Sequence, residues 1–585
     1  MYRKSIGENV YIESEERMVT VKTEVLFKDM PPLDSPECNF PGLMQGEKIY
    51  KKGTVTKKGR RPMPCDILCD SDREFVIGRK RLTVYADIYR PATNEQVPAI
   101  ICWGYGGKRD TNNKIENIKL INKDGSEKKL IGNDKLSGLQ GWESLDPAQW
   151  VPDGYAIVNV DPPGVNYSEG NLLLFGSEDS ENGCDFIEQI AAEPWCTGKV
   201  AMAGSSWYAM VQLFFASQNP PHLTAIAPFE SEADLYRDEY VRGGMGLTPP
   251  AFSIGFRTHG RNQIEDIGAM IEKYPLMNDY WEDKIIHHEN INIPAYIVGS
   301  YTSWYHTRGT PKAYQNISSE EKWYRTHLKT EWIDLYGDYY QSDLKKFFDH
   351  YLKDEDNGWE DTPPVRLGLF NPGGENIENR PESQYPPENM IPEIYYLDLE
   401  SGVLMEEVPQ KLTQASYDDD DPESILLDLT FSERTEIIGP SKLKIWLEAL
   451  DSDDADIFVR YFKIDENKNK IICDDGWAGY IGPEGRLRAS HRELDEEKST
   501  LLEPVQKHER MLRLEEGEIV PLEIQIWPTG MIFEKGQTLR LEITGRDFTA
   551  DRPPNMIALK GINKGRCRIL SGAGYDSQLV LPVCR

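Results

Sequence analysis

Apolar residues in the first two thirds of the chain fall into short runs separated by segments of helical length. Residues 82–89 alternate apolar and polar positions, which predicts a half-buried strand, whereas residues 97–103 are almost continuously apolar and predict a fully buried one. Further apolar runs of strand length occupy residues 156–161, 200–204, 224–228, 295–299 and 323–327. Strands that alternate with helices form a parallel sheet with helices on both faces, so an α/β domain is predicted.

The pattern changes towards the C-terminus. A Gly/Pro/Asn-rich tract over residues 371–392 predicts a linker. From residue 393 onward, short β-rich runs alternate with turn residues and few helical periods occur; the clearest runs are residues 443–447, 457–462, 519–527 and 538–543. This pattern predicts an all-β sandwich of the jelly-roll type.

A stretch rich in aromatic and charged residues interrupts the strand spacing between residues 231 and 291. Residues 236–240 and 264–274 have helical character, which predicts a helical cap over the carboxyl edge of the sheet that shapes specificity, with plain surface decoration as the alternative. The expected organisation is therefore an N-terminal arm with a few edge strands (1–70), an α/β domain (71–230 and 292–370), the cap (231–291), the linker (371–392) and the β domain (393–585).

The most informative chemical feature is the run 198–210, in which a short apolar strand ends in Gly-Ser-Ser and an apolar helix follows at once. A serine at such a turn adopts a strained conformation that exposes its Oγ, and it needs small neighbours two residues away on either side. Gly204 meets this need before Ser206, but Tyr208 follows, with Ala209 one step later. The run therefore indicates a nucleophile elbow, with an ordinary tight turn as the alternative.

Composition narrows the function classes. The chain has 585 residues, enough for two or three domains, and 97 acidic against 66 basic residues give a net charge of −31. This charge argues against nucleic acid or an anionic membrane surface as a partner. The nine cysteines are scattered without zinc spacing, and no apolar run is long enough for a membrane helix. We expect a cytoplasmic protein with reduced thiols, and a homodimer is the default assembly.

A serine hydrolase also needs a base, a group that orients the base, and donors for the oxyanion. His327 ends the last predicted sheet strand, downstream of the serine, which is the expected chain order for the base; His306 is the alternative. The backbone N–H of Trp207 is one candidate oxyanion donor. The loop Trp103-Gly104-Tyr105-Gly106-Gly107 is the second, with Tyr105 offering a phenolic O–H.

Four motifs in order along the chain resemble one family, the cocaine esterase, X-Pro dipeptidyl-peptidase and α-amino acid ester hydrolase group of serine hydrolases. From the N-terminus onward, the motifs are residues 161–164 with 168–170, residues 192–207, residues 347–353 and residues 487–492. The resemblance covers nearly the whole chain from about residue 70. It implies an α/β-hydrolase domain with a helical cap and a C-terminal jelly roll. It also implies Ser206 as nucleophile, His327 as general base, and Tyr105 with the Trp207 amide as oxyanion donors, without a metal or organic cofactor.

The chain departs from this family at the catalytic acid. An ungapped alignment places Ser303, after the strand 295–299, where the esterases carry aspartate. Loss of the orienting carboxylate can cost about 10⁴ in turnover. Three explanations are open: Asp334 supplies the carboxylate from another loop, Ser303 accepts the Nδ1–H as a neutral group, or hydrolysis has been lost. A second departure is Pro163, where relatives carry Arg, which is expected to remove one structural ion pair.

The function predicted from the sequence is hydrolysis of an ester or amide of a small acyl substrate through an acyl-enzyme. Ester cleavage is favoured over X-Pro peptide cleavage, because the acids that would bind a substrate ammonium are not located. Acyl transfer to an amine uses the same residues and is an alternative. So is a non-catalytic binding protein, which the vacant acid position supports. Carbohydrate binding by the β domain rests on jelly-roll analogy alone.

Overall fold

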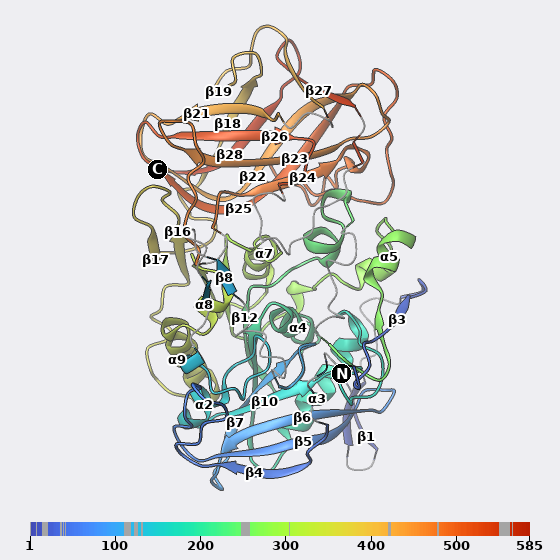
Figure 1. Ribbon diagram of the computed structural model, residues 1–585, viewed down its shortest axis with the longest axis vertical. Helices are drawn as coiled ribbons and strands as arrows, with labels where there is room; N and C mark the ends of the chain where they lie inside the picture. The colour runs from blue at the N-terminus through green and yellow to red at the C-terminus, as the bar shows by residue number, and fades with distance from the viewer. Residues whose placement is uncertain are drawn as a thin grey trace.

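The protein is described here by a computed structural model in which one α/β domain and one all-β domain lie at opposite ends of the long axis (Figure 1). The structure describes residues 2–6, 9–13, 21–35, 38, 40, 42–109, 119–121, 127–129, 133–246, 258–303, 305–418, 423–476, 479–548, 562–563 and 565–585.

The α/β domain is built on one sheet that has eleven strands in the described residues. In sheet order the strands are β17 (Ile377–Glu382), β16 (Val365–Leu369), β15 (Lys322–His327), β14 (Ala295–Ser300), β12 (Leu223–Phe229), β11 (Cys196–Ser205), β7 (Val97–Trp103), β10 (Ala156–Asp161), β6 (Leu82–Pro91), β5 (Ile67–Ile77) and β4 (Gly46–Tyr50). From β16 to β10 all neighbours are parallel, and the outer pairings are antiparallel.

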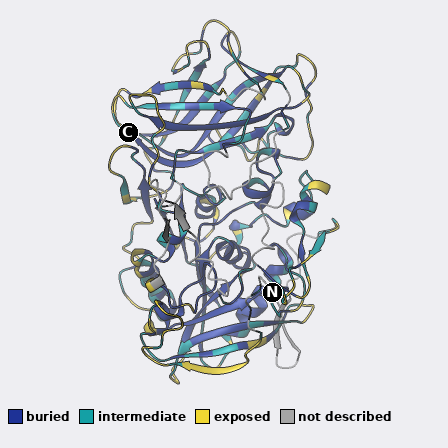
Figure 2. Cartoon of the chain, in the orientation of Figure 1, coloured by how far each residue is buried: buried dark blue, intermediate teal, exposed yellow. Residues whose placement is uncertain are grey.

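Burial explains why the central strands read as unbroken apolar runs. Every residue of β7, β10 and β14 is buried, because helices cover both faces of the sheet, whereas the edge strand β4 is largely exposed (Figure 2). The helical elements of this domain are η1 (Asn133–Lys135), α2 (Pro147–Trp150), η2 (Val151–Asp153), α3 (Ser177–Ala191), α4 (Trp207–Ala216), α7 (Gly309–Asn316), α8 (Glu331–Leu335) and α9 (Asp338–Lys353). Helix α4 is buried along its whole length and contributes to the apolar cores on both sides of the sheet.

The segment between β12 and β14 forms an irregular, partly helical layer. It contains η3 (Tyr236–Tyr240, a π-helix), η4 (Arg242–Gly244), α5 (Ile267–Lys273), α6 (Asp279–Glu282) and η6 (His288–Asn290). Strand β13 (Gln263–Glu265) pairs with β3 (Phe27–Asp29) of the N-terminal arm. The helix predicted over 264–274 therefore starts only at residue 267, and part of the predicted cap, residues 247–257, lies outside the described residues.

The C-terminal domain is all-β. Its sheet runs β20 (Thr413–Asp418), β27 (Arg566–Ser571), β22 (Thr435–Ala449), β25 (Val520–Phe533), β24 (Glu484–Arg488), β23 (Asp456–Ile464), β26 (Thr538–Thr544), β21 (Ile425–Thr430), β19 (Val403–Met405), β18 (Ile391–Asp398) and β28 (Gln578–Cys584). Strand β28 also pairs with β22, which brings the end of the sheet back onto its middle and encloses an apolar core. The domain is therefore barrel-like, and the short helix η7 (Ala489–His491) follows β24.

The predicted strands of both domains are confirmed, but the segments between them are more ordered than predicted. The predicted linker includes β17, which pairs with β16 and extends the α/β sheet. The N-terminal arm supplies β4 and the start of β5 as well as the small hairpin β1 (Tyr2–Ile6) and β2 (Asn9–Glu13). Strand β8 (Lys119–Ile121) pairs with β9 (Glu127–Lys129). Among the described residues, none of the helices combines the length and the apolar character needed to cross a membrane.

Candidate active site

Ser206 occupies a strained turn between β11 and α4. Its backbone has φ 59° and ψ −118°, a combination that costs a residue with a side chain about 1–3 kcal/mol. Two carbonyls hold it there, since the Ser206 amide lies 3.0 Å from the Phe229 oxygen and 3.1 Å from the Glu230 oxygen. Gly204 has φ 133°, and a Cβ at this position would come within 2.6 Å of the Tyr208 Cβ. These features confirm the strained turn between strand and helix that the sequence predicted at Ser206.

Tyr208 departs from the small-residue pattern of the elbow, and a second glycine accommodates it. The tyrosine is buried, and a Cβ on Gly104 would lie 2.2 Å from its Cζ atom. The tyrosine ring therefore fills the space that a glycine leaves in the loop after β7. This contact ties the elbow to the loop that carries Tyr105.

The structure places His306 beside Ser206. The Oγ atom of Ser206 lies 3.3 Å from Nε2 of His306, in the loop between β14 and α7. Hydrogen bonds from the Thr307 hydroxyl to the carbonyl oxygens of Ser300 (3.1 Å) and Ser303 (2.6 Å) fold this loop back over the sheet. His306 is 5% exposed, so its ring is held by the surrounding protein rather than by solvent.

His327 does not meet Ser206, which corrects the expectation that it is the base. Its Nε2 atom lies 3.0 Å from Oε1 of Glu230, and neither ring nitrogen forms a well-aligned hydrogen bond within the described residues. The reason is the strand order. Strand β15 lies three strands from β11, about 14 Å at the usual spacing, and His327 is still inside the strand, whereas His306 stands on a loop that can return. Chain order alone does not carry this information.

The Nδ1 side of His306 faces a hydroxyl and two carboxylates. Ser303 Oγ lies 3.0 Å from Nδ1, Glu230 Oε2 lies 3.5 Å away, and Glu331 Oε2 lies 3.6 Å away. Ser303 Oγ also accepts hydrogen bonds from the amides of Tyr305 (3.3 Å) and His306 (3.2 Å). These acceptors favour a proton on Nδ1, which leaves Nε2 free to accept the proton of Ser206.

Asp334 is engaged elsewhere, which corrects its expected role as the displaced acid. Both of its oxygens face the guanidinium of Arg325, with one Nη1 to Oδ1 distance of 3.2 Å. Arg325 is buried, and a buried guanidinium needs a carboxylate in this fork geometry. Burial by itself would raise the pKa of the Asp334 carboxyl, but attraction to Arg325 and His327 and the hydrogen bond from Arg325 together lower it.

Glu230, which the sequence analysis did not single out, is the carboxylate between the two histidines. It directly follows β12, has φ 56° and is fully buried. Burial by itself would raise the pKa of Glu230, but the contacts with His306 and His327 outweigh it and lower the pKa to about 2. A signal was present in the sequence, since Glu230 follows the predicted strand 224–228, and the carboxyl ends of parallel strands are where α/β sheets place their sites.

Two further carboxyls lie next to this group. Glu232 Oε1 is 4.0 Å from Nε2 of His306, and Glu232 in turn contacts Glu239. Burial raises the pKa of Glu232 well above its usual value, and burial raises the pKa of Glu239 to about 8. Near neutral pH the pair therefore holds protons, and the site does not carry the full charge of its acids.

The two residues that carry the predicted oxyanion donors pack against each other through their rings. The Trp207 amide is the first of helix α4 and so has no acceptor within the helix, and the Tyr105 ring lies 4.8 Å from the Trp207 ring between centroids. Tyr105 is also held through its carbonyl, which accepts a hydrogen bond of 2.9 Å from Thr258 Oγ1.

A buried ion cluster fixes the end of the Tyr105 loop. Lys108, which is fully buried, contacts Asp161 through Nζ, lies 3.1 Å from Asp72 through the same atom, and donates its amide to Asp161 (2.8 Å). Asp161 therefore keeps a cationic partner although Pro163 stands where relatives carry Arg. The expected loss of an ion pair at this turn is offset by Lys108.

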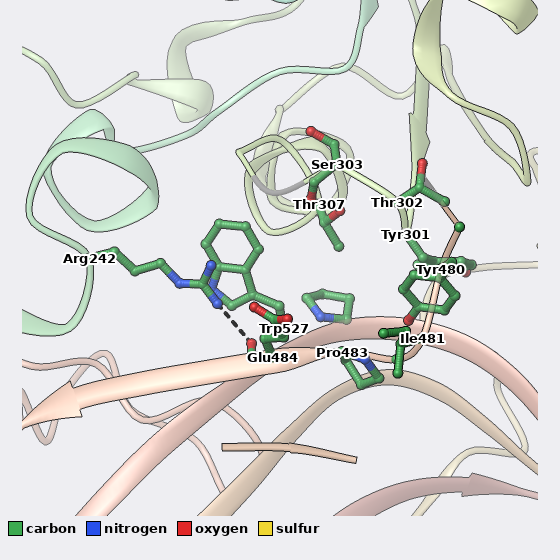
Figure 3. A pocket seen from close by; sticks show the side chains of 13 residues that line it. Arg242, Tyr301, Thr302, Ser303, Thr307, Tyr480, Ile481, Pro483, Glu484 and Trp527 are labelled. Carbon is green, nitrogen blue, oxygen red and sulfur yellow. Dashed lines mark hydrogen bonds between the residues drawn. The ribbon is translucent and has the colours of Figure 1, made fainter. Parts of the chain in front are cut away.

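A small cavity of about 50 Å³ adjoins the Ser303 side of the site, where the α/β domain, η4 and the β domain meet (Figure 3). On one side, the Arg242 guanidinium stacks 3.4 Å from the centre of the Trp527 ring and donates a hydrogen bond of 2.8 Å to the Glu484 carbonyl. The C-terminal domain thus forms part of the wall of this cavity.

The same side chains define which atoms could hold a metal. Glu230, His306 and Glu331 each offer one ligand atom, and these three atoms lie within 4.8 Å of one another. A nitrogen with two carboxylates suits several divalent ions, but the two carboxylates also lie beside His306 Nδ1 as hydrogen-bond acceptors. The donor set therefore fits the orientation of His306 as well as it fits a cation.

Comparisons with known proteins found matches that cover both domains. Residues 81–263 match the family described as X-Pro dipeptidyl-peptidase (S15 family), and residues 357–580 match the X-Pro dipeptidyl-peptidase C-terminal non-catalytic domain. The structure is similar to that of a CocE/NonD family hydrolase from Staphylococcus aureus, with 30% identity, 92% of this chain and 97% of that chain covered, and a TM-score of 0.84.

Two further similarities are weaker, one in sequence identity and the other in the length that is matched. A solved α-amino acid ester hydrolase, 14% identical, covers 91% of this chain and 98% of its own with a TM-score of 0.65, so it shares the fold alone. A cocaine esterase from Rhodococcus sp. (strain MB1 Bresler) is 34% identical over 109 residues, and the matched segment spans only 19% of the length of either protein.

Proposed function

Because the chain belongs to the CocE/NonD family of hydrolases, we propose that it is a serine hydrolase that cleaves an ester or amide bond through an acyl-enzyme on Ser206. The observation that carries the proposal is the distance of 3.3 Å between Ser206 Oγ and His306 Nε2 at a strained strand-to-helix turn. The parallel sheet, the elbow after β11 and the site at the carboxyl ends of the strands also support an α/β-hydrolase domain, and the barrel-like domain supports the jelly-roll assignment.

In the proposed mechanism, Ser206 attacks the substrate carbonyl while His306 Nε2 takes its proton. The Trp207 amide and the Tyr105 hydroxyl hold the oxygen that becomes negative. His306 then gives the proton to the leaving alcohol or amine. Water repeats the sequence on the acyl-enzyme, which releases the acid and restores Ser206; an amine in place of water would give acyl transfer.

A second candidate function is cleavage of substrates with a free amino group, such as X-Pro peptides or amino acid esters. One observation favours it: the carboxyl of Glu232 lies 4.0 Å from His306 Nε2, next to Glu239. An ammonium group bound there would face carboxyls whose protons it can displace. We rank plain ester cleavage first, since these carboxyls are protonated near neutral pH in the free protein.

The test is covalent labelling with a fluorophosphonate, read by intact mass and peptide mapping. We expect labelling of Ser206 in the wild type, none in Ser206→Ala, and labelling at least about 10³-fold slower in His306→Ala. His327→Ala should also be labelled, at a rate between those of the wild type and His306→Ala, because its ring does not contact Ser206. A folded wild-type protein with unlabelled Ser206 would instead support a binding protein without hydrolase activity.

The two substrate classes are separated by turnover of the wild type. A p-nitrophenyl acyl ester without an amino group should be hydrolysed faster than the p-nitroanilide of an X-Pro dipeptide. If the peptide substrate is faster, and Glu232→Gln slows it while sparing the ester, the second candidate replaces the first.

A further inference from the structure

We propose that Glu230 replaces the missing triad aspartate as the charged positioning residue of His306, and that its second oxygen is held by His327. This inference rests on the proposed function and deepens it. The triad is thereby shifted by one strand: the acid follows β12, and the base follows β14.

Sheet order supports this assignment. Strand β12 lies between β11 and β14, so the residue that follows β12 stands between the end that carries Ser206 and the loop that carries His306. The chain order of serine, acid and histidine is also kept. The positive φ of Glu230, 56°, turns its side chain from the strand, and the Glu230 amide is anchored to the Val298 carbonyl at 2.7 Å.

Both carboxylate oxygens of Glu230 contact histidine side chains. Oε2 lies 3.5 Å from His306 Nδ1, and Oε1 lies 3.0 Å from His327 Nε2. The side chain is fully buried, and in the part of the chain that the structure describes no lysine or arginine pairs with it. A carboxylate buried in this way is stable only beside a positive partner, and His306 becomes one when it takes the proton of Ser206.

Two other groups reach Nδ1, and they differ from Glu230 in kind. Ser303 is closer, at 3.0 Å, but it is neutral and already accepts two amide hydrogen bonds, so it orients the ring without balancing its charge. Glu331 is charged and lies 3.6 Å away, but its side chain is 14% exposed, whereas that of Glu230 is fully buried. Water screens an exposed carboxylate, so Glu230 contributes more to the imidazolium.

The role of His327 follows from the same geometry. It is the last residue of β15, the neighbour of β14, and its ring packs 5.1 Å from the Phe229 ring between centroids. From there it fixes the Glu230 carboxylate without touching the serine. During the reaction the proton moves from Ser206 Oγ to His306 Nε2 and from there to the leaving group, and Glu230 stays ionised throughout.

The experiment compares Glu230→Gln with Glu331→Gln, its matched control at the same nitrogen, using an activated ester. Loss of a triad acid can lower turnover by up to about 10⁴-fold, and we expect Glu230→Gln to lose at least about 10²-fold in kcat with KM little changed. We expect Glu331→Gln to lose less than about tenfold. His327→Gln should fall between them.

The pH profile separates positioning from simple damage to the fold. The groups that face His306 are Ser206, Ser303, Glu230, Glu232 and Glu331. Without the Glu230 charge the imidazolium is less stable, so the acidic limb of the kcat/KM profile should move to lower pH in Glu230→Gln. A merely structural role would lower activity and leave that limb in place.

Each outcome decides between the acids. If the acidic limb of the pH profile is unchanged in Glu230→Gln but shifted in Glu331→Gln, the role belongs to Glu331 and the proposal is overturned. Equal, small losses of kcat in both variants would also overturn it. If Glu230→Gln does not fold, Glu230→Asp provides the second variant, with partial activity expected. Failure of Ser206 to react with the fluorophosphonate in the wild type would instead reject the proposed function itself.

Discussion

The Oγ atom of Ser206 lies 3.3 Å from Nε2 of His306, a residue 100 positions further along the chain. Two intervening strands, β12 and β14, carry the chain from one residue to the other and place both at the carboxyl edge of the sheet. The pair joins a strained serine to a base whose other nitrogen is held by Ser303. The predictions below concern the groups that hold this pair in place.

Tyr105→Phe removes only the phenolic oxygen from the proposed oxyanion site. Loss of one such donor costs about 10²–10³ in kcat, with little effect on substrate affinity, because the donor acts on charge that develops during the reaction. Steady-state kinetics with an activated ester measure this, and Tyr396→Phe in β18 is the control. Unchanged kcat would mean that backbone amides alone stabilise the oxyanion.

Ser303→Ala removes the hydroxyl at 3.0 Å from His306 Nδ1. A hydrogen bond of this kind contributes about 1 kcal/mol, so kcat should fall by roughly fivefold while the carboxylates still hold the ring. Ser318→Ala, at the other side of α7, should be neutral. A loss as large as that of Ser206→Ala would show that the serine, and not a carboxylate, orients the base.

Lys108→Met tests the ion cluster under the Tyr105 loop. Removing one partner of a buried ion pair leaves the Asp161 charge uncompensated, which costs about 3–5 kcal/mol in the free energy of unfolding, whereas Asp72 keeps its contact with Arg109. Urea denaturation measures this loss. The control is Lys80→Met, an exposed pair with Glu178, where we expect less than about 1 kcal/mol. Equal effects would mean that the cluster contributes nothing specific.

Gly104→Ala places a methyl group against the Tyr208 ring, 2.2 Å from its Cζ atom. Overpacking of this kind costs about 1–3 kcal/mol, and here it also moves the loop that carries Tyr105, so kcat should fall as well. Gly536→Ala is a matched control without a nearby atom, although its φ of 84° adds strain. Wild-type kcat in Gly104→Ala would show that the loop does not depend on the contact.

The protonation of Glu239 should make the free energy of unfolding depend on pH. The folded-state pKa of its carboxyl, raised by burial to about 8, lies above the usual pKa of a glutamate, 4.5, so the folded protein holds a proton that the unfolded chain releases between these values. Stability from this group is complete below about pH 4.5 and is lost as pH rises through 8, by up to about 1.4 kcal/mol per pH unit.

Urea denaturation of the wild type and Glu239→Gln across this range measures the effect. The variant should lose less stability between pH 5 and pH 8 than the wild type does, since an amide has no proton to release. Glu534→Gln, on an exposed acid, should follow the wild type. Parallel curves for Glu239→Gln and the wild type would contradict the assignment.

Periodicity and local chemistry located most of the secondary structure and the turn at Ser206. The apolar runs at residues 97–103, 156–161 and 295–299 form strands that are buried on both faces. Each run is continuously apolar, so its burial can be predicted from that run alone. The elbow is equally local, since it depends on Gly204, on the strand before it and on the helix after it. The two domains, with their different periodicities, followed from the same kind of pattern.

The partner of Ser206 could not be obtained in this way. His306 and His327 both follow or end a predicted strand, and only the lateral order of strands shows that the first reaches the serine and the second does not. Asp334 was a plausible acid until its distance to Arg325 was known, and Glu230 gained a role only once both histidines lay beside it. The sequence by itself determined which local structures form, because each depends on neighbours in the chain. The tertiary structure decided which side chains meet, because contacts across a sheet depend on strand order and loop path.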